Sequence, residues 1–93
     1  MSLYYIDNVK ITTSLPINCV EWEFNTATVC FQHHYHQVTE LLVVLEGKLL
    51  CTAGERSYRL EKGDVLLLNP YTLHQGTSLG QGCRYLCITV PIS

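Results

Sequence analysis

Short hydrophobic segments separated by turn residues follow one another along most of the chain. From Val20 to Phe24, apolar residues alternate with glutamates, which predicts a strand with one buried face. The segments 41–45 and 65–68 are aliphatic without alternation, so both faces of these strands should be covered. The complete set of predicted strands comprises residues 20–24, 27–32, 40–45, 48–52, 56–60, 65–68 and 85–90.

Turn-forming residues lie between these predicted strands. They occur at Glu46-Gly47, Ala53-Gly54, Lys62-Gly63-Asp64, Asn69-Pro70 and from Gly76 through Gly82. No stretch of a dozen residues keeps a helical period, and the spacing of the strands is typical of an all-β sandwich or barrel. A chain of 93 residues is too short for two cores. We therefore expect one domain over residues 1–93, a small antiparallel β-barrel whose mouth can hold one ligand.

Charge and composition argue against nucleic acid and membrane as partners of this chain. The net charge is −2, and the six lysines and arginines are scattered, so this chain alone should not bind nucleic acid. No segment has the length of a membrane span or the pattern of a secretory signal, which predicts a soluble, cytoplasmic protein. The five cysteines are dispersed and should be reduced, small hydrophobic residues. Because so small a domain gains from additional burial, we expect a homodimer.

A cluster of polar residues precedes the aliphatic segment 41–45. His34, His36 and Glu40 share even parity, so an extended chain places them on one face, and a neighbouring strand can deliver His74 to the same pocket. Three imidazoles and a carboxylate suit Fe, Mn, Ni, Cu or Zn, and such a cation would explain why Glu40 opens a buried strand. The alternative is that the four residues hydrogen-bond one another and ordered water without a metal.

The same residues resemble the two motifs of the cupin superfamily. His34-x-His36-x3-Glu40-x6-Gly47 is similar to the first motif, and Gly63-Asp64, Asn69-Pro70 and His74 are similar to the second, over residues 32–76. The resemblance implies a cupin β-barrel, which is a double-stranded β-helix or jelly roll. Tyr71 stands where many cupins have a flexible glycine. A bulky side chain at the pocket rim makes Tyr71 a candidate lid and ligand-binding residue.

Within the cupins, the chain resembles the N-terminal sensor domain of AraC-type transcription regulators. The similar segments are Phe31–His36, Glu40–Gly47, Gly63–Pro70 with His74, and Tyr85–Val90. The resemblance implies that a small-molecule effector, such as a sugar, binds inside the barrel and is coupled to C-terminal helix-turn-helix units. Those units are absent from this sequence, so on this interpretation the chain is the sensing half of a longer protein. No residue is assigned a catalytic role.

Two other functions are compatible with the sequence. In a stand-alone metal-dependent cupin enzyme, a dioxygenase or isomerase, His34, His36, Glu40 and His74 would hold Fe or Mn and leave positions open for substrate. That hypothesis explains the ligand set, but no second acid, base or anion-binding arginine is recognisable near the motifs. An inert dimerisation module would leave Glu40 unexplained. The sequence therefore favours the sensor function.

Overall fold

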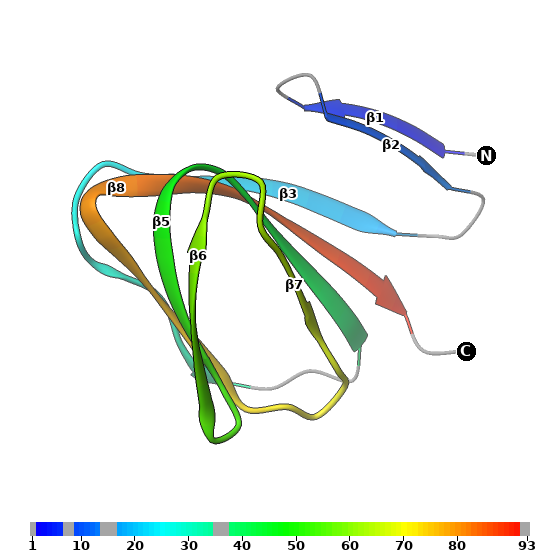
Figure 1. The fold of residues 1–93 in the computed structure, drawn as a ribbon. Helices are drawn as coiled ribbons and strands as arrows, with labels where there is room; N and C mark the ends of the chain where they lie inside the picture. The colour runs from blue at the N-terminus through cyan, green and yellow to red at the C-terminus, as the bar shows by residue number, and fades with distance from the viewer. Residues whose placement is uncertain (1, 7–8, 14–16, 35–37, 92–93) are drawn as a thin grey trace.

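The computed structural model describes the backbone of residues 2–6, 9–13, 17–34 and 38–91, and side chains within 17–31 and 38–90. In this part of the chain every regular element is a strand (Figure 1). The strands are β1 (Ser2–Ile6), β2 (Val9–Thr13), β3 (Asn18–Phe24), β4 (Val29–His34), β5 (Val38–Ala53), β6 (Arg56–Glu61), β7 (Val65–Leu68) and β8 (His74–Pro91). All pairings are antiparallel, which confirms the predicted fold class. None of these residues forms a helix able to cross a membrane.

Two long strands organise the domain. β5 and β8 pair from Val38↔Pro91 to Ala53↔His74, and both turn back at the same end of the molecule (Figure 1). The first half of β5 pairs with β7 and its second half with β6, while β8 pairs with β4 and then with β3. The sheet thus folds into two layers, which we call layer one (β3, β5, β7, β8) and layer two (β4, β5, β6, β8). This is the predicted jelly roll.

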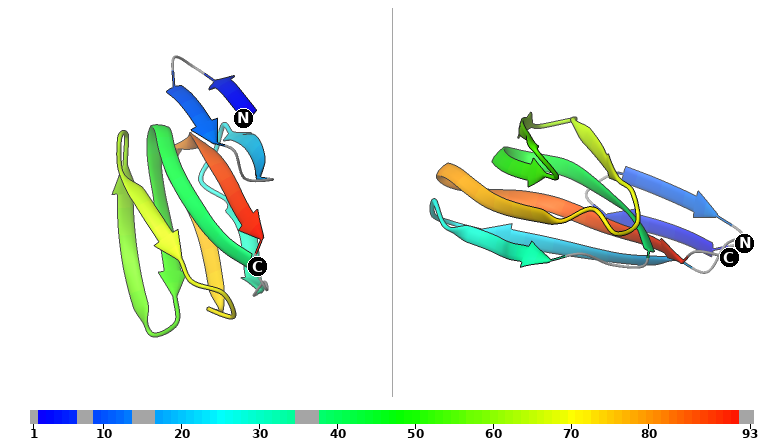
Figure 2. Two further views of the ribbon diagram at one scale, coloured as in Figure 1. Left: turned by 90° about the vertical axis from the view of Figure 1, so that its right-hand side faces the viewer. Right: turned by 90° about the horizontal axis from the view of Figure 1, so that it is seen from below.

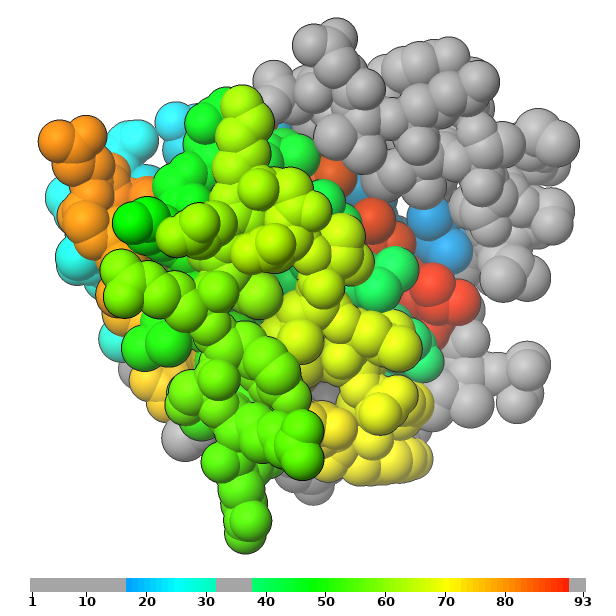
Figure 3. Space-filling view, in the orientation of Figure 1, coloured from blue at the N-terminus to red at the C-terminus, as the bar shows by residue number. Residues whose placement is uncertain are grey.

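The β1–β2 hairpin was not predicted from the sequence and forms a separate two-stranded sheet outside the six-stranded sheet (Figure 2). β6, β7 and the turn that follows β7 cover one face of the molecule (Figure 3). These two short strands were predicted closely, since β7 has the expected bounds and β6 is one residue longer than expected.

Two predicted turns are wrong. Glu46-Gly47 lies within β5, so the expected strands 40–45 and 48–52 form one strand of 16 residues. The stretch from Gly76 through Gly82 lies within β8, a strand of 18 residues. In both places the glycines bend a continuing strand instead of reversing it, because the register shifts where Gly47↔Cys83 is followed by Lys48↔Leu79. Residues 80–82 of β8 bulge at this corner.

The core lies between the two layers. Leu42 and Val44 of β5 are 1% exposed and pack with Leu49 and Cys51 from the second half of the same strand. The alternate residue Leu45 joins Leu86 and Ile88 in a second cluster on the outer face of layer one. Both faces of the segment 41–45 are therefore covered, as predicted.

Two expectations about burial are wrong. Val65 and Leu67 of β7 are 57% and 56% exposed, because in the described chain β7 pairs with β5 alone and its outer face is open. In β3, Val20 and Trp22 are also exposed, at 37% and 49%, so the apolar alternation of this strand does not form a fully buried face. β3 pairs with β8 alone among the described strands, and edge position explains both cases.

The corner of the barrel requires glycine. Gly47 and Gly82 have φ angles of 75° and 107°; Gly47 lies against the backbone of β8, and Gly82 lies against the end of β3. A Cβ atom on Gly82 would overlap the carbonyl oxygen of Phe24 and lie 2.7 Å from its carbonyl carbon. Gly54 has a similar φ of 61°, but a Cβ there would meet nothing within 4 Å. The energetic cost of a positive φ angle and the cost of a steric clash can therefore be measured separately by experiment.

We expect Gly82→Ala to lower the free energy of unfolding by about 3 kcal/mol or more, because alanine adds a backbone clash to the cost of positive φ. Gly54→Ala is the matched control and should cost about 1 kcal/mol, from backbone conformation alone. Urea denaturation followed by circular dichroism measures both values. Equal effects of the two substitutions would contradict the role of Gly82 at the corner.

Candidate functional site

A buried carboxylate and a buried imidazole meet inside the barrel. Glu40 lies in the first half of β5, opposite Leu68 and Thr89, and is 6% exposed. His74 begins β8 in layer two, opposite Ala53 at the far end of β5, and is 3% exposed. Glu40 Oε2 and His74 Nε2 are nevertheless 3.0 Å apart, because the two layers face each other. The contact between these side chains therefore joins the layers across the interior.

The partners of His74 define where its protons lie. Nδ1 is 2.8 Å from the carbonyl oxygen of Thr72, and a carbonyl only accepts, so Nδ1 carries a hydrogen. A proton between Nε2 and the Glu40 carboxylate then completes the second contact. Burial lowers the pKa of His74, but the hydrogen bond to Glu40, the Thr72 carbonyl and the charge of Glu40 outweigh burial and raise that pKa above its usual range.

A thiol completes the polar end of the site. Cys87 Sγ donates to Glu40 Oε1 at 2.7 Å, and Cys87 lies opposite Leu42 in the pairing of β5 with β8. Burial, followed by the hydrogen bond and the charge of Glu40, raises the pKa of the Cys87 thiol strongly, so the group stays protonated as a donor. The sequence pattern predicts only a small hydrophobic residue at this position. Cys87 follows Tyr85 by two residues in the last strand, so both side chains point to the same face. This alternation is the sequence signal that places Cys87 on the inner face of the barrel.

The polar group faces a cavity of about 200 Å³ inside the barrel. The described residues that line the cavity are Trp22, Cys30, Phe31, Glu40, Leu42, His74, Tyr85 and Cys87. The ring of Phe31 makes T-shaped contacts with His74 and Tyr85, with centroids 5.6 and 6.4 Å apart, respectively. The wall is therefore aromatic and aliphatic except at one end, where the carboxylate, the imidazole and the thiol meet. Such a cavity suits a small molecule with an apolar body and a polar group.

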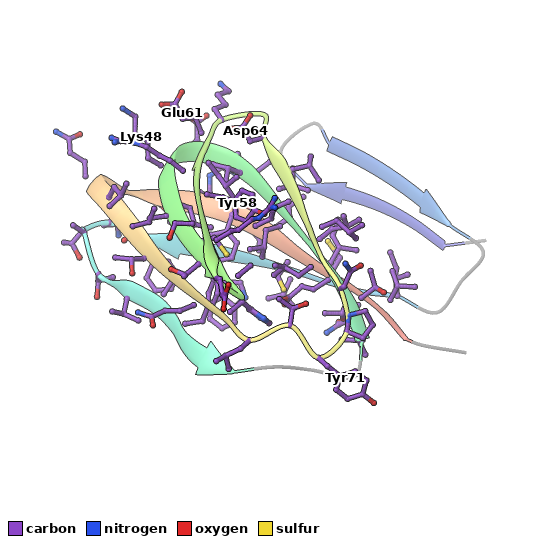
Figure 4. All side chains as sticks on the ribbon, turned by 60° about the horizontal axis from the view of Figure 1, so that its bottom comes forward. Lys48, Tyr58, Glu61, Asp64 and Tyr71 are labelled. Carbon is purple, nitrogen blue, oxygen red and sulfur yellow. The ribbon has the colours of Figure 1, made fainter. Side chains whose placement is uncertain are left out.

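The other residues predicted for the site are His34, His36 and Tyr71, and the structure does not place any of their side chains in the cavity lining that it describes. The backbone of His34 lies in β4 opposite His74, while its side chain and the whole of His36 lie outside the described residues. Tyr71 is 60% exposed and points away from the barrel (Figure 4). It has a φ of 64°, a conformation suited to the glycine that many cupins have there. Its role as a ligand-binding lid stays a prediction. Tyr58 of β6 packs against the core instead of lining the cavity.

The site can be tested for its fit to a metal. Two neighbouring ligands of an octahedral metal, each about 2.1 Å from it, lie about 3 Å apart. The separation of 3.0 Å between Glu40 Oε2 and His74 Nε2 matches that geometry. Among the residues that the structure describes, no group of three or more His, Cys, Asp or Glu side chains could hold a metal. The further ligands would have to be His34 and His36, the other two residues of the predicted set.

Several solved structures share this fold. A cupin protein from Bacteroides fragilis is 24% identical and superposes with a TM-score of 0.73 over 83% of this chain and 67% of that chain. KdgF from Halomonas sp. is 15% identical, with a TM-score of 0.76 over 100% of this chain and 88% of that chain. The cupin domain of Schizosaccharomyces pombe Cnp3 is 11% identical, with a TM-score of 0.77 over 98% of this chain and 59% of that chain. These similarities show the cupin fold.

Sequence comparison is more specific. An uncharacterized HTH-type transcriptional regulator of Bacillus subtilis, YdeC, is 27% identical over 81 residues, which are 85% of this chain and 28% of the regulator. The chain thus spans less than a third of that relative's length. Residues 17–93, which include β3 to β8 and the whole described cavity, match the AraC-like ligand binding domain. The chain therefore belongs to the AraC-like ligand binding domain family.

Proposed function

We propose that the chain is the effector-sensing domain of an AraC-type transcription regulator, and that its effector binds in the cavity at Glu40 and His74. The observation that carries the proposal is the buried carboxylate–imidazole contact, which faces a cavity of about 200 Å³ in an otherwise apolar interior. Burying such a pair is costly and contributes little net stability, so a binding role explains it better than a purely structural role. The similarity to a longer transcriptional regulator supports the same function.

The position of the pair indicates how binding would be transmitted. Glu40 belongs to layer one and His74 to layer two, so a ligand that contacts both residues would shift the equilibrium between different arrangements of the two layers. Glu40 also lies opposite Thr89, two residues before the end of β8 at Pro91. A ligand that favours one arrangement of the pair would shift the population of conformations at the end of that strand. A DNA-binding part attached beyond β8 would sense this shift.

The residues at the site act as hydrogen-bonding groups in this proposal. Glu40 accepts from the Cys87 thiol and shares a proton with His74, and a polar group of the effector would join this network. A divalent Fe, Mn, Ni, Cu or Zn ion held by His34, His36, Glu40 and His74 would instead polarise an oxygen atom of the ligand. The enzyme alternative requires an acid, base or cationic residue beyond those ligands. Apart from Glu40 and His74, the described lining residues include no lysine, arginine, aspartate or further glutamate or histidine.

The homodimer and the cytoplasmic location expected from the sequence are part of the same proposal. A sensor that acts on two half-sites of DNA works as a symmetric pair. Gel filtration with light scattering would measure the mass of the chain in solution.

The first prediction concerns effector binding. A library of small metabolites, screened by thermal unfolding, should contain compounds that raise the melting temperature of the chain. Glu40→Gln should weaken such binding at least about tenfold, since a hydrogen bond to a charged group contributes about 1.5–3 kcal/mol. Glu61→Gln is the control, because Glu61 lies in an exposed ion pair with Lys48 (Figure 4). Unchanged affinity in the Glu40 variant would contradict the proposed site.

The second prediction concerns His74. Its pKa in the folded chain should exceed 6.5 by NMR, and Glu40→Gln should lower it, because burial then acts without the opposing charge. A raised folded pKa stabilises the fold fully below pH 6.5, and this contribution is lost as the pH rises through the folded value. The free energy of unfolding attributable to His74 should therefore decrease with rising pH in the wild type. A His74 pKa below 6.5, or one unaffected by Glu40→Gln, would contradict the pairing.

The third prediction concerns metal. We expect less than about a tenth of a metal ion per chain after loading with Fe, Mn or Zn and desalting, because the Glu40 carboxylate already accepts from Cys87 and is paired with His74. The protein should carry no histidine tag, and elemental analysis gives the stoichiometry. Retention of about one ion per chain, lost in Glu40→Gln, would contradict the hydrogen-bonded site and support the four-residue ligand set.

A further inference from the structure

The charges around the cavity restrict the class of effector. Among the described lining residues, the ionisable carboxylate is Glu40, and lysine and arginine are absent. Arg84, the arginine of β8, lies outside this lining and is 2.8 Å from Glu21 and 3.9 Å from Glu46. The described wall therefore contains one carboxylate, Glu40, and an imidazole, His74, that already has partners.

Those partners make His74 a poor site for an anion. Nδ1 donates to the carbonyl oxygen of Thr72 at 2.8 Å, and Nε2 faces the carboxylate of Glu40 at 3.0 Å. An anionic ligand would have to break one of these contacts and would then lie beside a like charge in a buried site. A carboxylate or phosphate is normally held by arginine, lysine or several N–H groups, and the described lining includes no arginine or lysine. A cationic ligand differs, because a carboxylate can accept several hydrogen bonds, so Glu40 could accept from an ammonium group beside its contacts with His74 and Cys87.

The rest of the wall suits the body of such a cation. The aromatic residues Trp22, Phe31 and Tyr85 line the cavity, and Leu42 adds an aliphatic surface. Trp22 is 49% exposed, although its ring belongs to a stacked series with Phe24 and Tyr85 whose centroids are 6.5 and 6.3 Å apart. Aromatic faces attract cations and bury apolar groups. A sugar would need many hydrogen-bond partners for its hydroxyl groups, and this wall is mainly aromatic and aliphatic.

We propose that the effector is a small organic cation, a protonated amine on an aromatic or other apolar body, with its ammonium group beside Glu40 and its body against Trp22 and Phe31. This inference rests on the proposed sensor function and specifies the ligand of the same cavity. A volume of about 200 Å³ corresponds to about seven water molecules at liquid density, which suits one ring with a short side chain. The ammonium group would donate to the Glu40 carboxylate, and the apolar body would lie against the aromatic wall.

Three probes with the same body test the charge preference. Phenethylamine is a cation near neutral pH, phenethyl alcohol is neutral and hydrocinnamate is an anion, while arabinose represents the sugars. Trp22 is the chain's single tryptophan and lines the cavity, so its fluorescence reports binding directly. The chain is first treated with EDTA so that no metal contributes charge. We expect phenethylamine to bind with a dissociation constant at least about tenfold lower than the alcohol, and hydrocinnamate and arabinose to give no saturable change.

Two variants connect this preference to Glu40. Glu40→Gln should reduce the difference between the amine and the alcohol to less than about threefold, since the amide keeps the shape and removes the charge. Glu23→Gln is the matched control: Glu23 is an exposed carboxylate next to Trp22 in β3 and should leave the preference intact. Circular dichroism checks that each variant is folded. The comparison of probes on the wild-type chain tests the proposal even if Glu40→Gln does not fold.

The outcomes separate this inference from the sensor function. Equal affinity for amine and alcohol, tighter binding of hydrocinnamate, saturable binding of arabinose, or no binding of the amine would each overturn the cationic class. The sensor function would survive these results if the metabolite screen gave a ligand whose binding is lost in Glu40→Gln. Both would fail if no ligand of any class depended on Glu40.

Discussion

A carboxylate inside an apolar barrel must have partners, and the rest of this structure is arranged around that requirement. Glu40 is 6% exposed, and His74 and Cys87 supply its contacts from β8. His74 lies opposite the far end of β5 in the pairing of the two long strands, yet its ring reaches Glu40 across the interior. Folding the sheet into two layers is therefore what completes the site. A flat sheet with the same pairing would leave Glu40 and His74 far apart.

The corner that folds the sheet depends on glycine. Gly47 of β5 lies opposite Cys83 of β8, and Gly82 approaches the backbone of Phe24 too closely for a side chain. These residues let both strands continue from one layer to the other with a shift in register. The stability of the corner and the geometry of the cavity are consequently linked, although the glycines lie away from the Glu40–His74 contact.

Much of the fold was predictable because local patterns determine it. Short hydrophobic segments bounded by turn residues predict β6 and β7, and parity together with the cupin spacing predicts that Glu40 and His74 share one pocket. The glycines of the corner were misinterpreted, because a glycine that bends a strand and a glycine that reverses it look alike in one sequence. The exposure of Val65 and Leu67 depends on which strands lie at an edge. The role of Cys87 depends on a contact between distant strands, which no local pattern encodes.

The account makes the interior cavity, and Glu40 in particular, the place where the effector acts. A fragment screen followed by NMR on the isotopically labelled chain tests this claim most directly, because it assumes no ligand class and reports the location of every hit. The account predicts that the strongest hits perturb His74, Cys87 and the aromatic residues of the cavity wall. It would be contradicted if the hits gathered elsewhere, for example on the exposed face of Val65 and Leu67, while the signals of His74 stayed unchanged.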